Sequence, residues 1–291
     1  MRTVLPILIL CSACGPDAKS DSAADMADPG PTSGTLRVLT YNVAGLPDGI
    51  SSAEGALLDR MPAIKSKLSE YDLIGLQEDF DEAAHTALTE GSGHAEVQWF
   101  SERADDERVY GAGLSQVLPW ASTAYREEHY THCNGVLDGA SDCLASKGFQ
   151  TTSLRLGSEV LDVYNTHHEA GGGPEDADAR LAQVDQLLAA VDTHSVHHAV
   201  LLTGDFNLHP DDLEDAEPLG RYEDANLQRA CDLVGCPEAN HIDQIRVRSS
   251  PTLSLEVLEW SRATEFVSDE GVDLSDHPAI SAVIAWEVVG S

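Results

Sequence analysis

The chain has 291 residues, of which 42% are hydrophobic, and this is enough for one large domain with a substantial core. It carries 50 acidic and 17 basic residues, which gives a formal net charge of −33. Such a surface repels polyanions at long range, so the charge argues against nucleic acid as the main partner, although a few local cations or a bound metal can still recruit a phosphate. An acidic bias of the source proteome is an equally good explanation of the charge.

The first 14 residues have the features of an export signal. Arg2 precedes an apolar run at residues 4–10 that is too short to span a bilayer. Ala13 then precedes Cys14, which is similar to a bacterial lipoprotein signal, in which the cysteine carries the lipid. We predict a signal peptide at residues 1–14 with lipidation of Cys14; ordinary secretion with cleavage near the same place is the alternative. Either route exports the protein, as an outer-membrane or cell-surface lipoprotein or as a secreted protein.

The segment after the signal has the composition of a tether. Residues 15–34 are rich in Asp, Ser, Ala, Pro and Gly and show no apolar period, which predicts disorder. About 20 flexible residues reach roughly 25 Å, which would hold a domain close to a membrane surface. Residues 35–291 show no second linker and no internal repeat, so we predict one catalytic domain there, acting as a monomer.

Four cysteines remain if Cys14 is lipidated and the signal is removed. They form two close pairs, Cys133 with Cys143 and Cys231 with Cys236. In an oxidising compartment we predict a disulfide within each pair, with free buried thiols as the alternative. Neither pair has the two-residue spacing of a zinc knuckle, which argues against metal binding by these cysteines.

The rest of the chain mixes short apolar strands with helical patterns. Apolar spacing predicts helices at residues 55–70 and 81–90 and a third that begins near residue 176. Strands are predicted at residues 36–43, 72–76, 110–117, 149–156, 160–166, 199–203, 241–247 and 279–287. The turn near Gly157 and Ser158 indicates a hairpin between the fourth and fifth of these strands. This mixture predicts an α/β or α+β fold.

Polar side chains stand at the ends of many of these strands. Strand ends are where a rigid scaffold places reactive groups. One such residue is commonly a cap or a turn residue, but six such segments in one chain are hard to attribute to chance. The polar residues at these ends are Asn42, Glu78, His167, Asp205, Asn207, Asp243, Asp276 and His277.

The residue types at the strand ends suggest a reaction. Asn42, Glu78, Asp205 and Asp276 offer oxygen ligands, which suit magnesium, manganese or calcium. The sequence has no His-Glu-x-x-His stretch that would indicate a zinc protease. A hard cation with two histidines suits phosphoryl chemistry, because the cation neutralises the phosphate while one histidine activates water and a second donor stabilises the leaving side.

The motifs together resemble a known superfamily. Leu-Thr-Tyr-Asn at 39–42, Leu-Gln-Glu at 76–78, Gly-Asp-Phe-Asn at 204–207 and Ser-Asp-His at 275–277, with Thr166-His167 and Ile242-Asp243 between them, resemble the endonuclease/exonuclease/phosphatase superfamily over about residues 36–287. The resemblance implies an α/β fold of the four-layer α/β/β/α sandwich type, with two packed mixed β-sheets flanked by helices.

The resemblance also implies a metal site. Glu78 is expected to be the main ligand, with Asn42 beside it and Asp276 close to the metal. Mg²⁺ is the expected ion, and Mn²⁺ or Ca²⁺ are alternatives.

Catalytic roles are implied in the same way. Asp205 and Asn207 are expected to orient the nucleophile and the phosphate, and His167 to donate to the phosphate oxygens. His277 is expected to be the general base, held by Asp243. An imidazole with a pKa of ~6.5 can take up a proton at neutral pH, which suits this role.

Finer motifs are similar to the bacterial and neutral sphingomyelinases. They are residues 77–81, 110–114, 142–149 and 166–171. This similarity implies a sphingomyelinase C-like phosphodiesterase that acts on a phospholipid at a membrane surface. An extracellular deoxyribonuclease-like endonuclease on the same fold is the main alternative. A non-catalytic surface lipoprotein and an inositol phosphatase are weaker ones, since a binder does not need the full site and this chain has few cations for a highly anionic substrate.

Two cations are further candidates for the site. Lys147 is either a turn residue or the one cation placed near the anionic site. Arg180 is either a solvated charge, which we favour, or a contact for a substrate phosphate.

Overall fold

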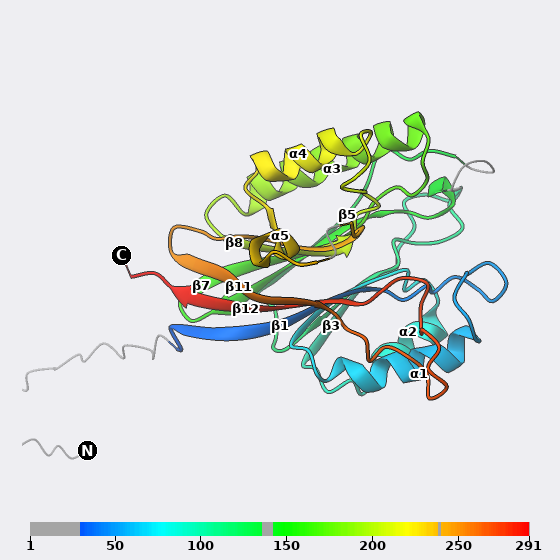
Figure 1. The fold of residues 1–291 in the computed structure, drawn as a ribbon, viewed down its shortest axis with the longest axis horizontal. Coiled ribbons are helices and arrows are strands. Elements are labelled where there is room, and N and C mark those ends of the chain that lie inside the picture. The colour runs from blue at the N-terminus through cyan, green and yellow to red at the C-terminus, as the bar shows by residue number, and fades with distance from the viewer. Residues whose placement is uncertain (1–29, 136–141, 238–239, 291) are drawn as a thin grey trace, which may run out of the picture.

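The computed structural model describes residues 30–135, 142–237 and 240–290. Two six-stranded sheets pack face to face, with helices on their outer faces (Figure 1). The first sheet has the strand order β11 (Leu253–Arg262), β12 (Ile280–Val288), β1 (Ser33–Asn42), β2 (Leu73–Gln77), β4 (Leu114–Leu118), β3 (Glu96–Phe100). The second has the order β5 (Ala124–His129), β6 (Gly148–Leu156), β7 (Glu159–His167), β8 (Ala199–Asp205), β10 (Asp243–Arg248), β9 (Gln228–Arg229). The predicted four-layer α/β/β/α sandwich is confirmed.

Both sheets are mixed. The strands β1 and β2 pair in parallel, as do β7 and β8, and the remaining pairs are antiparallel. The register of β1 against β12 places Ser33 opposite Glu287, so the C-terminal strand ends beside the start of β1. The other end of β1 carries Asn42, and the chain therefore enters the domain at the end of the sandwich away from this residue.

Helices cover the outer face of each sheet (Figure 1). The first sheet is covered by α1 (Leu57–Leu68) and α2 (Glu82–Thr89), and the second by α3 (Pro174–His194) and α4 (Ala216–Asp224). The short helix α5 (Ala230–Val234) contacts β10 and β11. Leu57, Met61, Ile64 and Leu68 repeat at helical spacing, and this stripe of α1 packs in one cluster with outward side chains of the first sheet.

The layer between the sheets changes from apolar to polar along the strands. Because strand side chains alternate between faces, Leu36 and Val38 of β1 join the core between the sheets. Further along, this layer contains Gln77 and Asn165, whose side chains are joined by a 2.7 Å hydrogen bond. Both side chains are buried. Gly75 leaves room for this packing, since a Cβ there would lie 2.1 Å from the hydroxyl of Thr203. The fold thus builds a buried polar layer toward one end of the sandwich.

The sequence predicted the central strands and missed several edge elements. The strands β3, β5 and β11 and the helix α4 were not predicted. The strand predicted at residues 110–117 begins later, at Leu114, because Gly113 adopts a left-handed conformation with φ of 62°. The first strand begins at Ser33, two residues before the predicted start of the domain.

Both predicted disulfides are present, Cys133–Cys143 and Cys231–Cys236. The predicted signal peptide, Cys14 and most of the predicted tether lie outside the described residues. Within the part of the chain that the structure describes, no helix has the length and apolar character needed to cross a bilayer.

Candidate active site

Three polar side chains meet where β1, β2 and β8 end. The amide Nδ2 of Asn42 donates to Glu78 Oε1 and to Asp205 Oδ2, each at 3.0 Å. Asn42 and Asp205 are buried, and Glu78 is partly buried. Since Asp205 comes from the second sheet and the other two from the first, the site bridges the two sheets. The grouping of these three residues at strand ends agrees with the sequence analysis.

The backbone holds Glu78 in an unusual conformation. Its φ is 59°, in the left-handed region that non-glycine residues rarely adopt. The next residue, Asp79, is buried, and its Oδ2 lies 2.6 Å from both Ser115 Oγ and His85 Nδ1. The carbonyl of Glu78 also packs on Gly45, where a Cβ would come within 1.9 Å of the oxygen. These contacts direct the Glu78 carboxylate to Asn42.

Arg60 of α1 joins two loops of the site. Its guanidinium donates to the carbonyls of Val43 at 2.9 Å, Ala44 at 2.8 Å and Leu274 at 2.8 Å. The side chain is buried, with 3% exposed. Ser275 adds a second link, since its hydroxyl donates to the carbonyl of Asn42 at 2.7 Å. The end of β1 is therefore fixed to the loop that carries Asp276 and His277.

A histidine and a carboxylate pair next to this group. His277 Nδ1 lies 3.0 Å from Asp243 Oδ2, and its Nε2 lies 3.8 Å from Asp205 Oδ2. Burial alone lowers the pKa of His277, but the hydrogen bond and charge of Asp243 and the charge of Asp205 outweigh it and raise the pKa to about 10. Burial and the proximity of Asp205 raise the pKa of Asp243 to about 6. Asp205, Asp243 and His277 also place one ligand atom each within 4.8 Å of one another.

A second histidine lies on the other side of Asp205. His167 Nε2 is 3.4 Å from Asp205 Oδ2 and 3.2 Å from Lys147 Nζ. Lys147 is buried and also donates to the carbonyl of His168 at 2.6 Å. Burial and then the charge of Lys147 lower the pKa of His167 well below 6.5. Of the two readings of Lys147, the structure supports a cation at the anionic site.

The remaining predicted residues are placed less centrally. The backbone N–H of Asn207 donates to Asp205 Oδ1 at 3.0 Å, and its Nδ2 donates to the carbonyl of His168 at 3.0 Å. Asp276 is exposed, and its Oδ1 lies 3.4 Å from the hydroxyl of Ser275. Among the described residues, no hydrogen bond or ion pair joins Asp276 to Glu78 or Asn42.

The preferred interpretation of Arg180 as a solvated charge is wrong. Its side chain is 3% exposed and forms an ion pair with the buried Asp215 at 3.0 Å. It also donates to the carbonyl of Gly171 at 2.8 Å. A buried guanidinium needs such partners, and here they fix α3 to the loops on either side of it.

Six of the polar residues described above line one cleft of about 490 Å³. Its polar base contains the side chains of Glu78, Lys147, His167, Asp205, Asn207 and His277. The rest of the lining is largely apolar, namely Leu46, Ile50, Phe80, Val109, Tyr110, Leu144, Ala145 and Ala170. The side chains at its mouth are open to solvent, since Ile50 is 63% and Val109 57% exposed. The cleft therefore combines an ionisable base with an apolar mouth.

The family model for the endonuclease/exonuclease/phosphatase family matches residues 39–277, which is most of the described domain. The chain belongs to this family. Curated sphingomyelinases of Mycobacterium tuberculosis and Mycobacterium bovis are 30% identical to it over 274 residues, which covers 85% of this chain and 52% of each relative. The chain thus spans about half the length of the curated relatives it matches.

Solved structures share the fold of this family member. Staphylococcus aureus beta toxin has a TM-score of 0.65 at 18% identity, covering 85% of this chain and 99% of the toxin chain. Sphingomyelinase C from Streptomyces griseocarneus has a TM-score of 0.64 at 20% identity, covering 86% of this chain and 99% of the sphingomyelinase chain. TDP2 of D. rerio, complexed with a single strand DNA product, has a TM-score of 0.66 at 16% identity, covering 86% and 98%. At these identities the likeness establishes the fold alone.

Proposed function

We propose that the chain is a metal-dependent phosphodiesterase that hydrolyses phospholipids of the sphingomyelin type and releases the phosphorylated headgroup. The observation that supports this most strongly is the cleft itself. Its base joins oxygen ligands to a His–Asp pair, which suits phosphoester hydrolysis. Its mouth is apolar, which suits a substrate with an apolar leaving portion. The curated relatives named sphingomyelinase agree with this proposal.

The residues at the base of the cleft fit a divalent cation. Burial raises the pKa of Glu78; the hydrogen bond from Asn42 works against this rise, and Asp205 adds to it. A cation beside Glu78 would stabilise the ionised carboxylate and so offset this rise in pKa. Carboxylate and amide oxygens are also ligands that Mg²⁺ takes. We assign Glu78 and Asn42 as ligands and keep Asp276 as a proposed third. One beta toxin structure of the same fold has bound magnesium ions, which agrees with Mg²⁺; Mn²⁺ and Ca²⁺ remain alternatives.

A cation held there would supply Lewis acidity and neutralise charge on the phosphate. His277 takes the proton of the attacking water at Nε2, while its Nδ1–H donates to Asp243. The carboxylates of Asp243, Asp205 and Glu78 raise the pKa of His277. Neutralising the charge at Glu78 and Asp205 therefore lowers this pKa toward the neutral range in which a base works.

The side of the cleft away from His277 is proposed to contact the phosphate. Lys147, His167 and Asn207 have side-chain nitrogens close to Asp205 or to the carbonyl of His168, which supports a role for them in binding the nonbridging oxygens. Lys147 is buried, and a lysine contact to a phosphate oxygen is stronger in a site that is mostly shielded from water. We propose that Asp205 orients this group and the nucleophile.

A nuclease on the same fold is the alternative, since one solved structure of this fold carries a DNA product. Polyanion binding relies on many phosphate contacts from lysine and arginine. Among the described residues that line the cleft, Lys147 is the one such side chain. Together with the net charge of −33, this favours lipid over DNA.

The two disulfides fit an oxidising compartment, and we infer that the protein is exported. Lipidation of Cys14 and a membrane anchor remain proposals. Mass spectrometry of the protein from a bacterial membrane fraction would detect a diacylglyceryl group on Cys14, and a water-soluble mature form without it would contradict the anchor.

The purified protein can be assayed side by side on sphingomyelin vesicles, phosphatidylcholine vesicles and plasmid DNA with Mg²⁺. We expect phosphocholine release that is abolished by a chelator and by His277→Ala. DNA nicking without lipid turnover would assign the same site to a nuclease. Failure on all three substrates by a folded protein would support a binding role instead.

A further inference from the structure

Two segments far apart in sequence form one apolar side of the cleft. Val109 and Tyr110 both donate their backbone N–H to the carbonyl of Leu144, at 2.8 and 3.0 Å, and Tyr110 forms a β-bridge with Ala145. All four side chains line the cleft. We call these four residues the apolar wall. Because the two segments are joined in this way, the wall behaves as one body.

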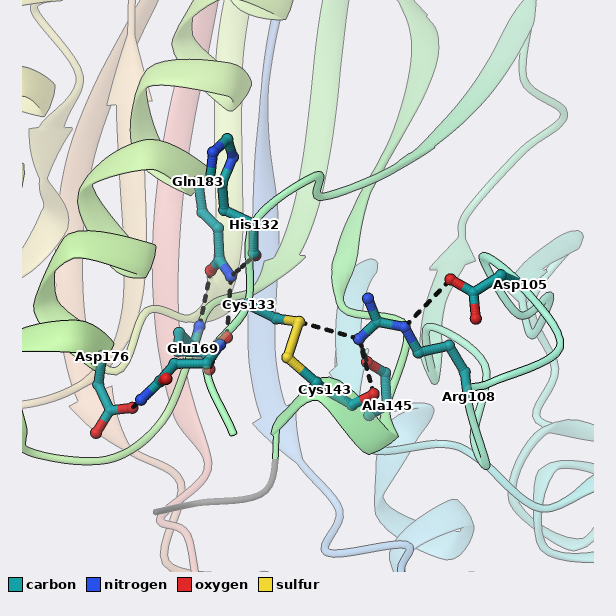
Figure 2. The surroundings of a disulfide bond; sticks show 10 residues. Asp105, Arg108, His132, Cys133, Cys143, Ala145, Glu169, Asp176 and Gln183 are labelled. Atoms are coloured by element: carbon teal, nitrogen blue, oxygen red, sulfur yellow. Dashed lines mark hydrogen bonds and ion pairs between the residues drawn. A yellow bond between two sulfur atoms is a disulfide. The ribbon is translucent and has the colours of Figure 1, made fainter. Parts of the chain in front are cut away.

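A disulfide and an arginine hold the outer end of this wall (Figure 2). Cys133 and Cys143 are bonded across 10 residues of sequence, and Cys143 directly precedes the wall residue Leu144. Arg108, which directly precedes Val109, donates from Nη1 to the carbonyl of Cys143 at 2.8 Å and lies 3.2 Å from the Sγ of Cys133. We call Arg108, Cys133 and Cys143 the clasp.

The far side of the clasp is attached to the helical layer. Asn134 donates its backbone N–H to Glu169 Oε1 and its Nδ2 to Asp176 Oδ1, both at 2.6 Å. Gln183 of α3 donates to the carbonyl of His132 at 2.8 Å. Figure 2 shows Glu169, Asp176 and Gln183 on one side of the disulfide and Arg108 on the other. The disulfide thus links the wall covalently to a segment that contacts α3 and Glu169, in the loop between β7 and α3.

The polar floor of the cleft, where Lys147 contacts His167, has its own attachments to the second sheet. Lys147 is followed directly by β6, and its carbonyl accepts the backbone N–H of Tyr130 at 2.9 Å. His167 belongs to β7, which pairs with β6 along its length. Opening the clasp would therefore remove the anchor of the wall at Cys143. Ser146, whose backbone N–H donates to the carbonyl of Tyr110 at 3.1 Å, would still join the wall to Lys147, and the contact between Lys147 and His167 would persist.

We propose that the clasp is a redox-responsive element that positions the apolar wall for lipid substrates. This rests on the proposed lipid hydrolysis. A dithiol reductant converts the Cys133–Cys143 bond to two thiols and is itself oxidised to a disulfide, with two electrons and two protons transferred. The guanidinium of Arg108 stabilises Cys133 as the leaving thiolate, which favours attack at the half-buried Cys143. Reduction removes the covalent anchor of the wall at Cys143 and selectively lowers activity on lipid.

The first test compares two substrates in matched variants of the full chain. Turnover is measured on sphingomyelin vesicles and on bis(p-nitrophenyl) phosphate, a small soluble phosphodiester, with Mg²⁺ binding measured by calorimetry. For Cys133→Ser/Cys143→Ser we expect kcat/KM on vesicles to fall on the order of 10- to 100-fold, as for other losses of substrate positioning, with the soluble diester and Mg²⁺ affinity retained. Cys231→Ser/Cys236→Ser, which removes the other disulfide, should keep the vesicle activity.

An equal loss on both substrates, an equal loss in the Cys231/Cys236 control, or no loss on vesicles would each overturn the proposal. If the circular dichroism spectrum shows that the Cys133/Cys143 variant is unfolded, Arg108→Met, which keeps the disulfide, is tested instead. The proposal then requires that Arg108→Met lower activity on vesicles more than activity on the soluble diester. A wild-type protein that turns over neither substrate would refute the proposed function instead.

The second test does not depend on activity. Reduction by dithiothreitol is followed by mass spectrometry of alkylated cysteines. We expect Arg108→Met to slow reduction of Cys133–Cys143 on the order of threefold, because the leaving thiolate loses its cation, and to leave Cys231–Cys236 unchanged. Equal rates of Cys133–Cys143 reduction in the wild type and in Arg108→Met would contradict the proposed role of Arg108.

Discussion

Replacing Arg60 by Met should both destabilise the protein and disrupt the site. Arg60 is 3% exposed, and its guanidinium makes three hydrogen bonds of 2.8–2.9 Å to the carbonyls of Val43, Ala44 and Leu274. A hydrogen bond from a charged donor contributes about 1.5–3 kcal/mol, and a buried carbonyl left without a donor loses about 1–3 kcal/mol. Burial of the charge offsets part of this, as the lowered pKa of Arg60 indicates. We therefore expect a loss of about 3–5 kcal/mol in the free energy of unfolding.

Thermal unfolding of the metal-free protein provides the assay. A loss of this size corresponds to a fall in Tm on the order of 10 °C for a domain of this length. Arg60→Lys should be intermediate, since one ammonium group cannot reach both loops in the same way. Arg37→Met is the matched control, because Arg37 is exposed and its side chain makes a surface ion pair with Glu70 and a cation–π contact with Tyr71. A Tm for Arg60→Met equal to that of the Arg37 control would refute the role of Arg60 in joining the loops.

Three further predictions concern the site. His277→Ala should lower kcat by about 10²–10⁴-fold, the range for loss of a general base, while Mg²⁺ binding measured by calorimetry persists. Glu78→Ala should weaken Mg²⁺ binding itself, and unchanged affinity in that titration would exclude it as a ligand. In the metal-free protein the pKa of His277 is raised from 6.5 to about 10, so its stabilising contribution is complete below pH 6.5 and is lost as the pH rises to about 10. The Tm of chelator-treated protein should fall across this window, and His277→Gln should flatten that fall.

The central part of the fold could be predicted because its signal is local. Strands such as β1, β2, β7 and β8 are buried, so their sequences are rich in apolar residues. The polar residue at or just after the end of each strand indicates the end of the sandwich where the candidate active site lies. The edge strand β5 has the sequence Ala-Tyr-Arg-Glu-Glu-His and buries none of its residues fully, so it lacks an apolar period. The helix α4 buries little more than Pro218 and Tyr222, which leaves no stripe to detect. Edge elements therefore escape a reading that depends on burial.

The sequence analysis also missed residues that hold the site in place through contacts with distant parts of the chain. Arg60 lies in a helix whose spacing fits an ordinary amphipathic pattern, and its partner Leu274 is 214 residues away. Asp79 follows Glu78, but nothing local indicates that its carboxylate meets Ser115 and His85. Arg180 was misjudged for the same reason, since its partner Asp215 comes from a distant loop. Such partners depend on tertiary packing, which one sequence does not encode as a pattern.

The two histidines of the site differ in a way that supports their different proposed roles. Both have Nε2 near Asp205 Oδ2, His167 at 3.4 Å and His277 at 3.8 Å. Burial and Lys147 lower the pKa of His167, so this imidazole is neutral at pH 7 and can bind a phosphate without titrating. The carboxylate of Asp243 raises the pKa of His277, so this imidazole is the one whose proton responds to charge in the site. When the environments of two titratable groups push their pKa values apart, their acid–base roles separate as well. A neutral His167 beside Lys147 and a titrating His277 beside Asp243 therefore agree with the proposal that one side of the cleft binds the phosphate and the other activates water.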